Sequence, residues 1–191
     1  TGGDKNAKKL YELLLKYRDV LMQGKSCRTV KPENAEEEQM AKELYLLTNK
    51  PVMYVCNVDE SSAKDGNEYV ERVREATKDE EADILIISAK IESDIAELES
   101  YEERQMFLEE MGLEESGVIR LIQHAYSLLN LRTYFTVGVE ECRAWTINKG
   151  DKAPRAASVI HTDFEKGFIR AEVIKYEDFI ELKSEAACRA A

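Results

Sequence analysis

Apolar residues recur at helical spacing in the first part of the chain. Residues 5–22 carry an apolar position at every third or fourth place, which predicts an amphipathic helix. We expect this stripe to pack in an antiparallel helical arm whose other half precedes Thr1. Asn34 is placed to cap a second helix with an acidic first turn, predicted to run to about Thr48. The stripe on the first helix consists of Leu10, Leu13, Leu14, Tyr17, Val20 and Leu21.

The middle of the chain alternates between short apolar runs and helical patterns. Residues 51–56 and 82–87 are apolar runs of strand length, and residues 68–77 between them predict a helix. This order predicts a right-handed crossover between parallel strands. Further helices are expected over residues 91–98, 101–111 and 116–129, with a turn at Gly112.

From Leu131 the apolar period changes from helical spacing to alternation. Residues 134–139 and 142–147 alternate around the turn residues Glu140 and Glu141, which predicts a β-hairpin. A short helix is expected at residues 156–160 after Pro154, and another strand at residues 168–176. The sequence therefore predicts a small mixed α+β module that begins near residues 129–131.

The net charge of −11 is unevenly distributed along the chain. Residues 31–120 carry 10 Lys and Arg against 25 Asp and Glu, whereas residues 1–30 carry seven against three. Because exposed acidic faces repel nucleic acid, RNA contacts are expected only from the first or last segment, and DNA is not expected as a partner. The acidic runs themselves are typical of solvated helix faces. No apolar run approaches the roughly 18 residues that span a bilayer, so no membrane partner is expected.

Polar residues follow both apolar runs of the predicted parallel sheet. Asn57-Val58-Asp59-Glu60 comes after the first run, and Ser88-Ala89-Lys90 comes after the second. Ligands of open α/β sheets lie beyond the carboxyl ends of the strands, so the two segments together indicate a pocket for a nucleotide base. An Asn amide can donate to a purine and tie loops together, and a carboxylate can accept from ring N–H groups. An ordinary strand followed by a polar turn gives the same local pattern, and that alternative stays open.

The chain contains no Gly-x-x-x-x-Gly-Lys-Ser/Thr motif, which is the loop that cradles nucleotide phosphates. It starts at Thr1 rather than Met and ends without a closing strand, so we expect a piece of a longer protein. No CxxC spacing indicates zinc or a disulfide framework, and reduced thiols in a cytoplasmic protein are expected. The cysteines are Cys27, Cys56, Cys142 and Cys188.

The two histidines and the close pairs of acidic residues are expected to have structural rather than catalytic roles. No nucleophile motif accompanies His161, so a turn or helix-capping role is expected there rather than catalysis. His124 is expected to be a surface or packed residue. Glu92 with Asp94 forms no assigned site, because close neighbours on a helix point in different directions.

Basic and aromatic residues are mixed in the last segment, as in small β modules that hold RNA. Burial of the aromatic residues in a core, with the basic charges balanced by ten acids, is the alternative. The residues concerned are Arg143, Lys149, Lys152, Arg155, Lys166 and Arg170, together with Tyr134, Phe135, Trp145, Phe164 and Phe168.

Two long segments of the chain resemble a known family. Residues 129–146, LNLRTYFTVGVEECRAWT, and residues 160–174, IHTDFEKGFIRAEVI, resemble the C-terminal TGS domain of the YchF subfamily of Obg-like ATPases. The Asn57 and Ser88 segments stand where that family has its fourth and fifth nucleotide motifs. Residues 4–22 stand where it has the returning part of a helical coiled-coil insertion. The resemblance covers essentially the whole chain.

The resemblance implies a fold and a division into domains. The implied class is α/β: part of a P-loop NTPase parallel sheet with a helical coiled-coil arm, followed by an α+β β-grasp (TGS) domain. The implied boundaries are residues 1–33 for the returning part of the arm, 34–129 for the C-terminal part of the P-loop domain, and 130–191 for a truncated TGS domain. Relative to the family, this chain lacks the P-loop, both switch segments and the final TGS strands.

The resemblance also implies a cytoplasmic, ribosome-associated hydrolase that binds ATP with Mg²⁺ and accepts GTP less well. Asn57 and Val58 would contact the base, and Ser88, Ala89 and Lys90 would line it. Glu60 would replace the Asp that reads guanine, although the adjacent Asp59 could take that place through a one-residue shift. No catalytic residue or Mg²⁺ ligand is expected among the 191 residues, so the chain alone is expected to be inactive. Arg143, Lys166 and Arg170 are the expected contacts with ribosomal RNA. An RNA- or protein-interaction module without hydrolytic activity is the alternative function.

Overall fold

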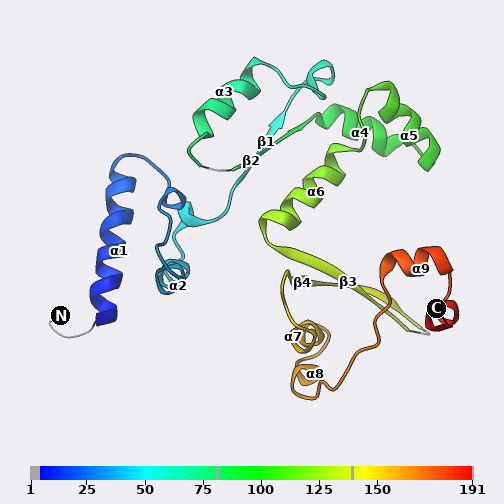
Figure 1. The fold of residues 1–191 in the computed structure, drawn as a ribbon. Helices are drawn as coiled ribbons and strands as arrows, with labels where there is room; N and C mark the ends of the chain where they lie inside the picture. The colour runs from blue at the N-terminus through cyan, green and yellow to red at the C-terminus, as the bar shows by residue number, and fades with distance from the viewer. Residues whose placement is uncertain (1–4, 81, 139, 191) are drawn as a thin grey trace. The chain divides into compact units, whose positions relative to one another are not determined.

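A boundary between Leu129 and Asn130 divides the chain into two units, each described by itself. The structure is a computed structural model that describes residues 5–80, 82–138 and 140–190 (Figure 1). None of the helices formed by these residues combines the length and the apolar composition that a membrane span requires.

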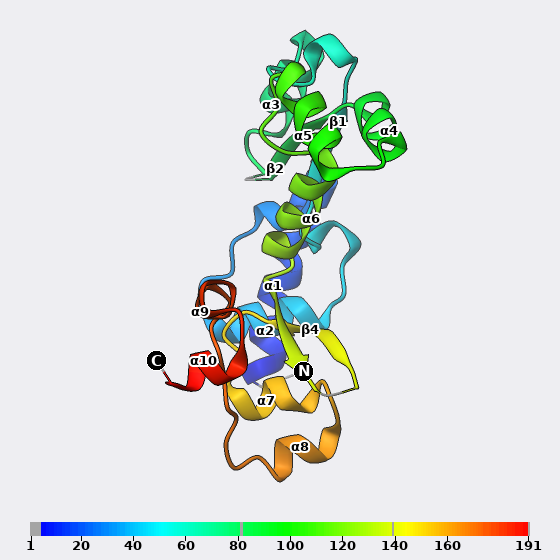
Figure 2. The ribbon, with the colours of Figure 1, turned by 90° about the vertical axis from the view of Figure 1, so that its right-hand side faces the viewer.

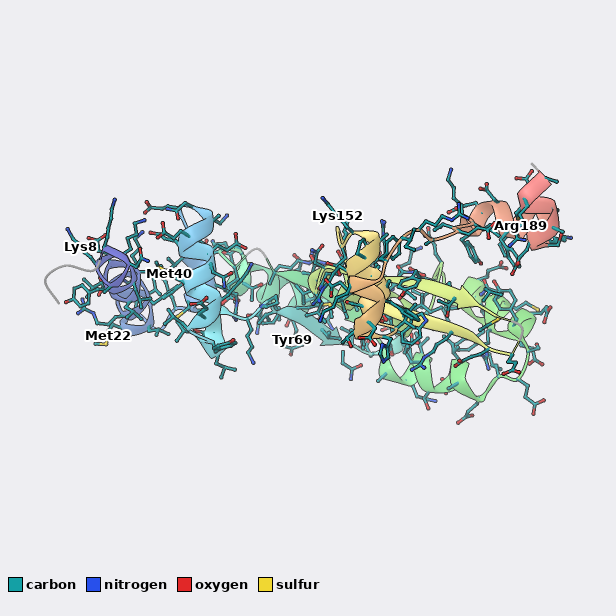
Figure 3. The ribbon with its side chains drawn as sticks, turned by 90° about the horizontal axis from the view of Figure 1, so that it is seen from below. Lys8, Met22, Met40, Tyr69, Lys152 and Arg189 are labelled. Atoms are coloured by element: carbon teal, nitrogen blue, oxygen red, sulfur yellow. The ribbon has the colours of Figure 1, made fainter. Side chains whose placement is uncertain are left out.

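The first unit begins with a helical layer. Helix α1 (Lys5–Met22) packs against the short 3₁₀ helix η1 (Cys27–Thr29) and against α2 (Ala35–Glu43). Leu13 and Tyr17 are buried from α1, and Met40 lies on the side of α2 that meets them (Figure 3). Helix α1 therefore buries part of its apolar stripe against a helix that follows it in the chain, while Leu14 and Leu21 remain exposed.

Helix α2 is shorter than the predicted helix that runs to Thr48. The Asn34 side chain caps its start as expected, accepting the Glu37 N–H at 3.0 Å. The helix ends because Tyr45 adopts φ 50°, in the left-handed region, and a right-handed helix cannot continue through that conformation. A separate 3₁₀ helix, η2 (Leu47–Asn49), follows.

The predicted strand, helix, strand unit is present. Strands β1 (Met53–Asn57) and β2 (Asp83–Ile87) pair in parallel, and α3 (Glu68–Thr77) is the crossover helix between them. The register places Asn57 opposite Ile87, so both strands end at the same edge of the sheet. This edge is where the two polar segments of the sequence meet.

Helices after β2 complete the first unit. Helix α4 (Ala89–Glu97) starts directly after β2 and is followed by α5 (Tyr101–Glu110) and α6 (Gly117–Leu128). Ile91, Ile95 and Leu108 are buried in one cluster, which also includes Ala63 after the 3₁₀ helix η3 (Glu60–Ser62). Figures 1 and 2 both show α4 and α5 next to each other beyond the end of β2. The apolar faces of α4 and α5 thus support the loops at this edge.

A half-buried ionic network ties the helical layer to the sheet. The Glu80 carboxylate accepts from the Tyr54 hydroxyl of β1 at 2.7 Å and from Arg28 of η1 at 3.3 Å. Arg28 also donates to the Thr48 carbonyl at 3.0 Å. The Tyr54 hydrogen bond, together with the Arg28 charge, lowers the pKa of Glu80. Its contribution to folding is therefore present above the ordinary pKa of a Glu and is lost as pH falls through the lowered value.

The second unit is built on the predicted hairpin. Strands β3 (Leu131–Val137) and β4 (Cys142–Asn148) pair antiparallel, with Tyr134 opposite Trp145. The predicted strand end at Val139 lies outside the described residues. Helix α7 (Ala153–Ser158) starts earlier than predicted, because Pro154 fits its first turn. Helices α8 (Thr162–Lys166), α9 (Tyr176–Leu182) and α10 (Glu185–Ala190) were not predicted.

The strand predicted over residues 168–176 is wrong. Residues 168–175 form an irregular connection, and Tyr176 starts α9. Ile169 and Val173 are 91% and 82% exposed. The alternation of apolar residues is strand-like, but a strand forms only when its backbone pairs with a neighbour, and the described sheet of this unit consists of β3 and β4.

Candidate functional site

The two predicted nucleotide segments meet at the carboxyl edge of the parallel sheet. The Asn57 side-chain oxygen accepts the Ala89 N–H at 2.9 Å, across 32 residues of sequence. Directly beside this bond, the Val58 N–H donates to the Ile87 carbonyl at 2.9 Å. The loops after β1 and β2 are therefore bonded to each other through one side chain and one backbone contact.

The bond to Ala89 fixes the orientation of the Asn57 amide. Because its oxygen is occupied by Ala89, the exposed Asn57 side chain offers its two N–H groups to a ligand. The same bond uses the Ala89 N–H, so Ala89 lines the site through its exposed methyl group and not as a backbone donor. This arrangement can donate to an acceptor such as a ring nitrogen of a purine.

The neighbouring acids Asp59 and Glu60 have different roles. Asp59 caps η3, where its carboxylate accepts from the Ser62 N–H and from the Ser61 hydroxyl, both at 2.9 Å. Hydrogen bonds from Ser62 and Ser61 lower the pKa of Asp59. Glu60 is exposed as the first residue of η3. Since Asp59 is engaged within its own turn, Glu60 is the acid that remains available to a ligand.

Ser88 and Lys90 differ strongly in exposure. Ser88 is only 3% exposed, and its buried hydroxyl has no hydrogen-bond partner among the described residues. Lys90 is exposed and forms an ion pair with Asp94 on the next turn of α4. The hydrogen bond that Lys90 donates to Asp94, and then the Asp94 and Glu60 charges, raise the pKa of Lys90. Lys90 is thus a cation at the rim, paired with Asp94.

Residues outside the predicted motifs support this edge. The Glu92 carboxylate accepts N–H groups at the start of α6, and Arg120 of α6 donates to the Ile86 carbonyl of β2 at 2.8 Å. His124, also on α6, lies 3.3 Å from the Asp83 carboxylate, in agreement with a packed surface residue. The sequence indicates no such role for Glu92 or Arg120, because nothing local to their segments shows which distant backbone groups they reach.

The basic residues predicted to bind RNA lie on different elements of the second unit. The guanidinium carbon of Arg143 lies 4.2 Å from the centroid of the Trp145 ring. The Trp145 indole N–H donates to the Thr136 hydroxyl at 2.9 Å. Lys166 lies in the last turn of α8. Arg170 lines a cavity of about 360 Å³ together with aromatic residues of α8 and the following connection. Arg143 and Arg170 are therefore each placed beside aromatic rings.

Aromatic side chains of the second unit do not form a buried core. Phe135 and Phe164 are exposed, and no residue among 130–138 and 140–190 is buried. The core alternative for these aromatic residues is therefore wrong for Phe135 and Phe164. His161 is the N-cap of α8, where its ring nitrogen Nδ1 accepts the Asp163 N–H at 3.2 Å, so the predicted capping role is confirmed.

The described residues contain no cluster of side chains suited to a metal ion. Among the described residues, no three His, Cys, Asp or Glu side chains gather where they could hold a metal ion. The four cysteines are free thiols, and Cys27 is buried. At this edge the Asn57 amide N–H groups and the Glu60 carboxylate are exposed, whereas the unpartnered Ser88 hydroxyl is buried.

Comparisons with known proteins agree on one family. A family model named YchF-GTPase_C, described as "Protein of unknown function (DUF933)", matches residues 131–191. The chain is 52% identical over 180 residues to the "Ribosome-binding ATPase YchF" of Bacillus subtilis, covering 93% of this chain and 48% of that protein. It is 41% identical over 194 residues to "Obg-like ATPase 1" of Pongo abelii, covering 100% of this chain and 48% of that protein.

A solved structure has the same fold. The structure titled "Structure of the Schizosaccharomyces pombe YchF GTPase" matches with a TM-score of 0.79 and 34% sequence identity. The match covers 96% of this chain and 49% of that one. The chain thus spans about half the length of the relatives that it matches.

Proposed function

This chain belongs to the YchF family of Obg-like ATPases, and from that premise we propose that it is the C-terminal part of a ribosome-associated protein that binds and hydrolyses ATP. Residues 34–129 would be part of the P-loop domain, residues 1–33 the returning part of the helical arm, and residues 130–191 a TGS domain. Association with ribosomes would place the whole protein in the cytoplasm.

The bond between Asn57 and Ala89 is the observation that carries this proposal. It joins the loops after β1 and β2 at the edge of the sheet where open α/β proteins hold their ligands. Asn57 and Val58 would contact the adenine, Glu60 would accept from its N–H groups, and Ser88, Ala89 and Lys90 would line the opposite side. When bound, Mg²⁺ would neutralise phosphate charge, and its ligands would come from residues outside this chain.

Exchanging Glu60 for aspartate tests which acid reads the base. In the full-length protein, Glu60→Asp is expected to shift the ratio of ATP to GTP affinity about tenfold toward GTP, because the shorter acid can reach the two N–H donors of guanine. Competition binding with both nucleotides measures the ratio. Glu68→Asp, at an exposed position at the start of α3, is the matched control. An unchanged ratio in the Glu60 variant would mean that other groups select the base.

The second unit is proposed to bind ribosomal RNA through Arg143, Lys166 and Arg170. The support is local: Arg143 lies over Trp145, and Arg170 lies beside aromatic residues in one cavity. Cations next to exposed rings can contact phosphates while the rings stack on bases. Lys166, at the end of α8, would add a phosphate contact.

Removing these three charges is expected to weaken binding to ribosomes. Each lost phosphate contact lowers the salt slope of binding by about one, so the triple Ala variant should lose about three units of slope and dissociate at about 0.1 M salt. Sedimentation with ribosomes at several salt concentrations measures this. The control replaces Lys175, Lys183 and Arg189 with Ala, which removes the same charge from the same unit. Equal pelleting of both variants and the parent would point to a protein-contact role for this unit.

An RNA- or protein-interaction module without hydrolytic activity is the second candidate function. It is favoured by the exposed aromatic residues of the second unit, which do not need a nucleotide to bind a partner. Ribosome binding by a full-length protein that hydrolyses no ATP would support this candidate.

A further inference from the structure

The Glu92 carboxylate of α4 joins this helix to the start of α6 through two hydrogen bonds. One oxygen accepts the Gly117 N–H at 2.6 Å, and the other accepts the Val118 N–H at 3.2 Å. These N–H groups belong to the first turn of α6, where a negative charge is favoured by the helix dipole. A bidentate, charge-assisted contact of this kind holds a side chain in one geometry.

Glu92 lies one helical turn after Ser88, the first residue of the segment that would line the base. Its backbone N–H donates to the Ser88 carbonyl at 3.0 Å, which closes the first turn of α4. That turn contains Ala89, whose N–H is bonded to Asn57. A fixed Glu92 therefore fixes the height and rotation of Ser88, Ala89 and Lys90 above the end of the sheet.

The start of α6 packs closely against both Glu92 and β2. A Cβ atom at Gly117 would lie 2.9 Å from the Glu92 oxygen and 2.9 Å from Cγ2 of Ile87 on β2, so only glycine lets α6 approach this closely. Arg120, one turn later, donates to the Ile86 carbonyl at 2.8 Å. Helix α6 is thus held against β2 at Gly117 and Arg120, and its first turn donates to Glu92 at the same place.

We propose that Glu92 is a positioning residue that holds the Ser88-Ala89-Lys90 segment in register with Asn57 for base binding. The inference rests on the proposed nucleotide function of this edge. Glu92 does not touch the base; its effect on affinity passes through the first turn of α4. Loss of the carboxylate frees that turn to shift, which misplaces the groups around the base without altering groups that act on the phosphates.

Kinetics and amide exchange of full-length variants test this role. Glu92→Ala is expected to raise KM for ATP about tenfold while kcat stays within about twofold of the parent, because only the base end of the site is disturbed. Exchange of the Ala89 amide without nucleotide is expected to speed up about tenfold. Glu92→Gln keeps one accepting oxygen, so its rise in KM and its gain in Ala89 exchange rate should both be smaller than those of Glu92→Ala. Glu97→Ala removes the same charge from the exposed end of α4 and should match the parent.

Each alternative outcome has a distinct meaning. Parental KM and parental Ala89 exchange in Glu92→Ala would overturn the inference. A fall in kcat with faster exchange throughout β1 and β2 would also overturn it, since that result indicates general destabilisation. If the parent itself turned over no ATP, the proposed function would fail, and the Ala89 amide would still decide whether Glu92 holds the loop.

Discussion

Replacing Asn57 with alanine in the full-length protein is expected to weaken ATP binding about 100-fold. The side chain has two tasks: its oxygen holds the Ala89 N–H at 2.9 Å, and its N–H groups are left to donate to the base. Each lost hydrogen bond is worth about 1–1.5 kcal/mol, and about 1.4 kcal/mol corresponds to a factor of ten in affinity. Titration with ATP by calorimetry or fluorescence measures the change.

Asn67→Ala provides the matched control for this variant. Asn67 is the N-cap of α3 and accepts the Tyr69 and Val70 N–H groups at 3.1 and 3.2 Å. Its loss is expected to lower the free energy of unfolding by about 1 kcal/mol and to leave ATP affinity unchanged. Parental ATP affinity in Asn57→Ala would contradict the placement of the base at the end of β1. A similar loss in both variants would indicate an effect on stability alone.

The 191-residue chain by itself is expected to show no ATP turnover and negligible nucleotide affinity. Most of the binding energy for a triphosphate comes from contacts with its phosphates and Mg²⁺. The sequence contains no Gly-x-x-x-x-Gly-Lys-Ser/Thr, and the described residues include no cluster that could hold a metal ion. All of the nucleotide affinity of this chain would have to come from base contacts of Asn57, Glu60 and the Ser88-Ala89-Lys90 segment.

A phosphate-release assay with Mg²⁺ and ATP measures the turnover of the isolated chain. The full-length protein is the positive control, and circular dichroism establishes that the chain is folded under the same conditions. Turnover above a buffer blank, proportional to the concentration of the chain, would show that residues 1–191 contain catalytic groups that the sequence motifs do not reveal. Retained ATP affinity without turnover would mean that the base contacts contribute more than expected.

Helix and strand positions were predictable wherever local pattern and local capping agreed. The helix over residues 5–22, the crossover helix over residues 68–77 and the β3–β4 hairpin all appear near the predicted bounds. The strand predicted over residues 168–176 failed because strand formation depends on a pairing partner, which alternation within one segment cannot supply. The helix after Asn34 ended early because Tyr45 takes a left-handed conformation that its side chain does not demand.

The sequence by itself determined the order of the main helices and strands of the first unit, the parallel pairing of β1 with β2, and which polar segments follow each strand. Periodicity and chain connectivity are local properties, so they could be read without the tertiary structure. Only the tertiary structure decided how those segments are used. It assigned Asp59 to capping η3, leaving Glu60 exposed, and it turned the Asn57 oxygen toward Ala89. It also joined Glu92 to the start of α6. These contacts link residues as far apart as 32 positions, and hydrogen bonds between distant segments depend on packing geometry that no local pattern encodes.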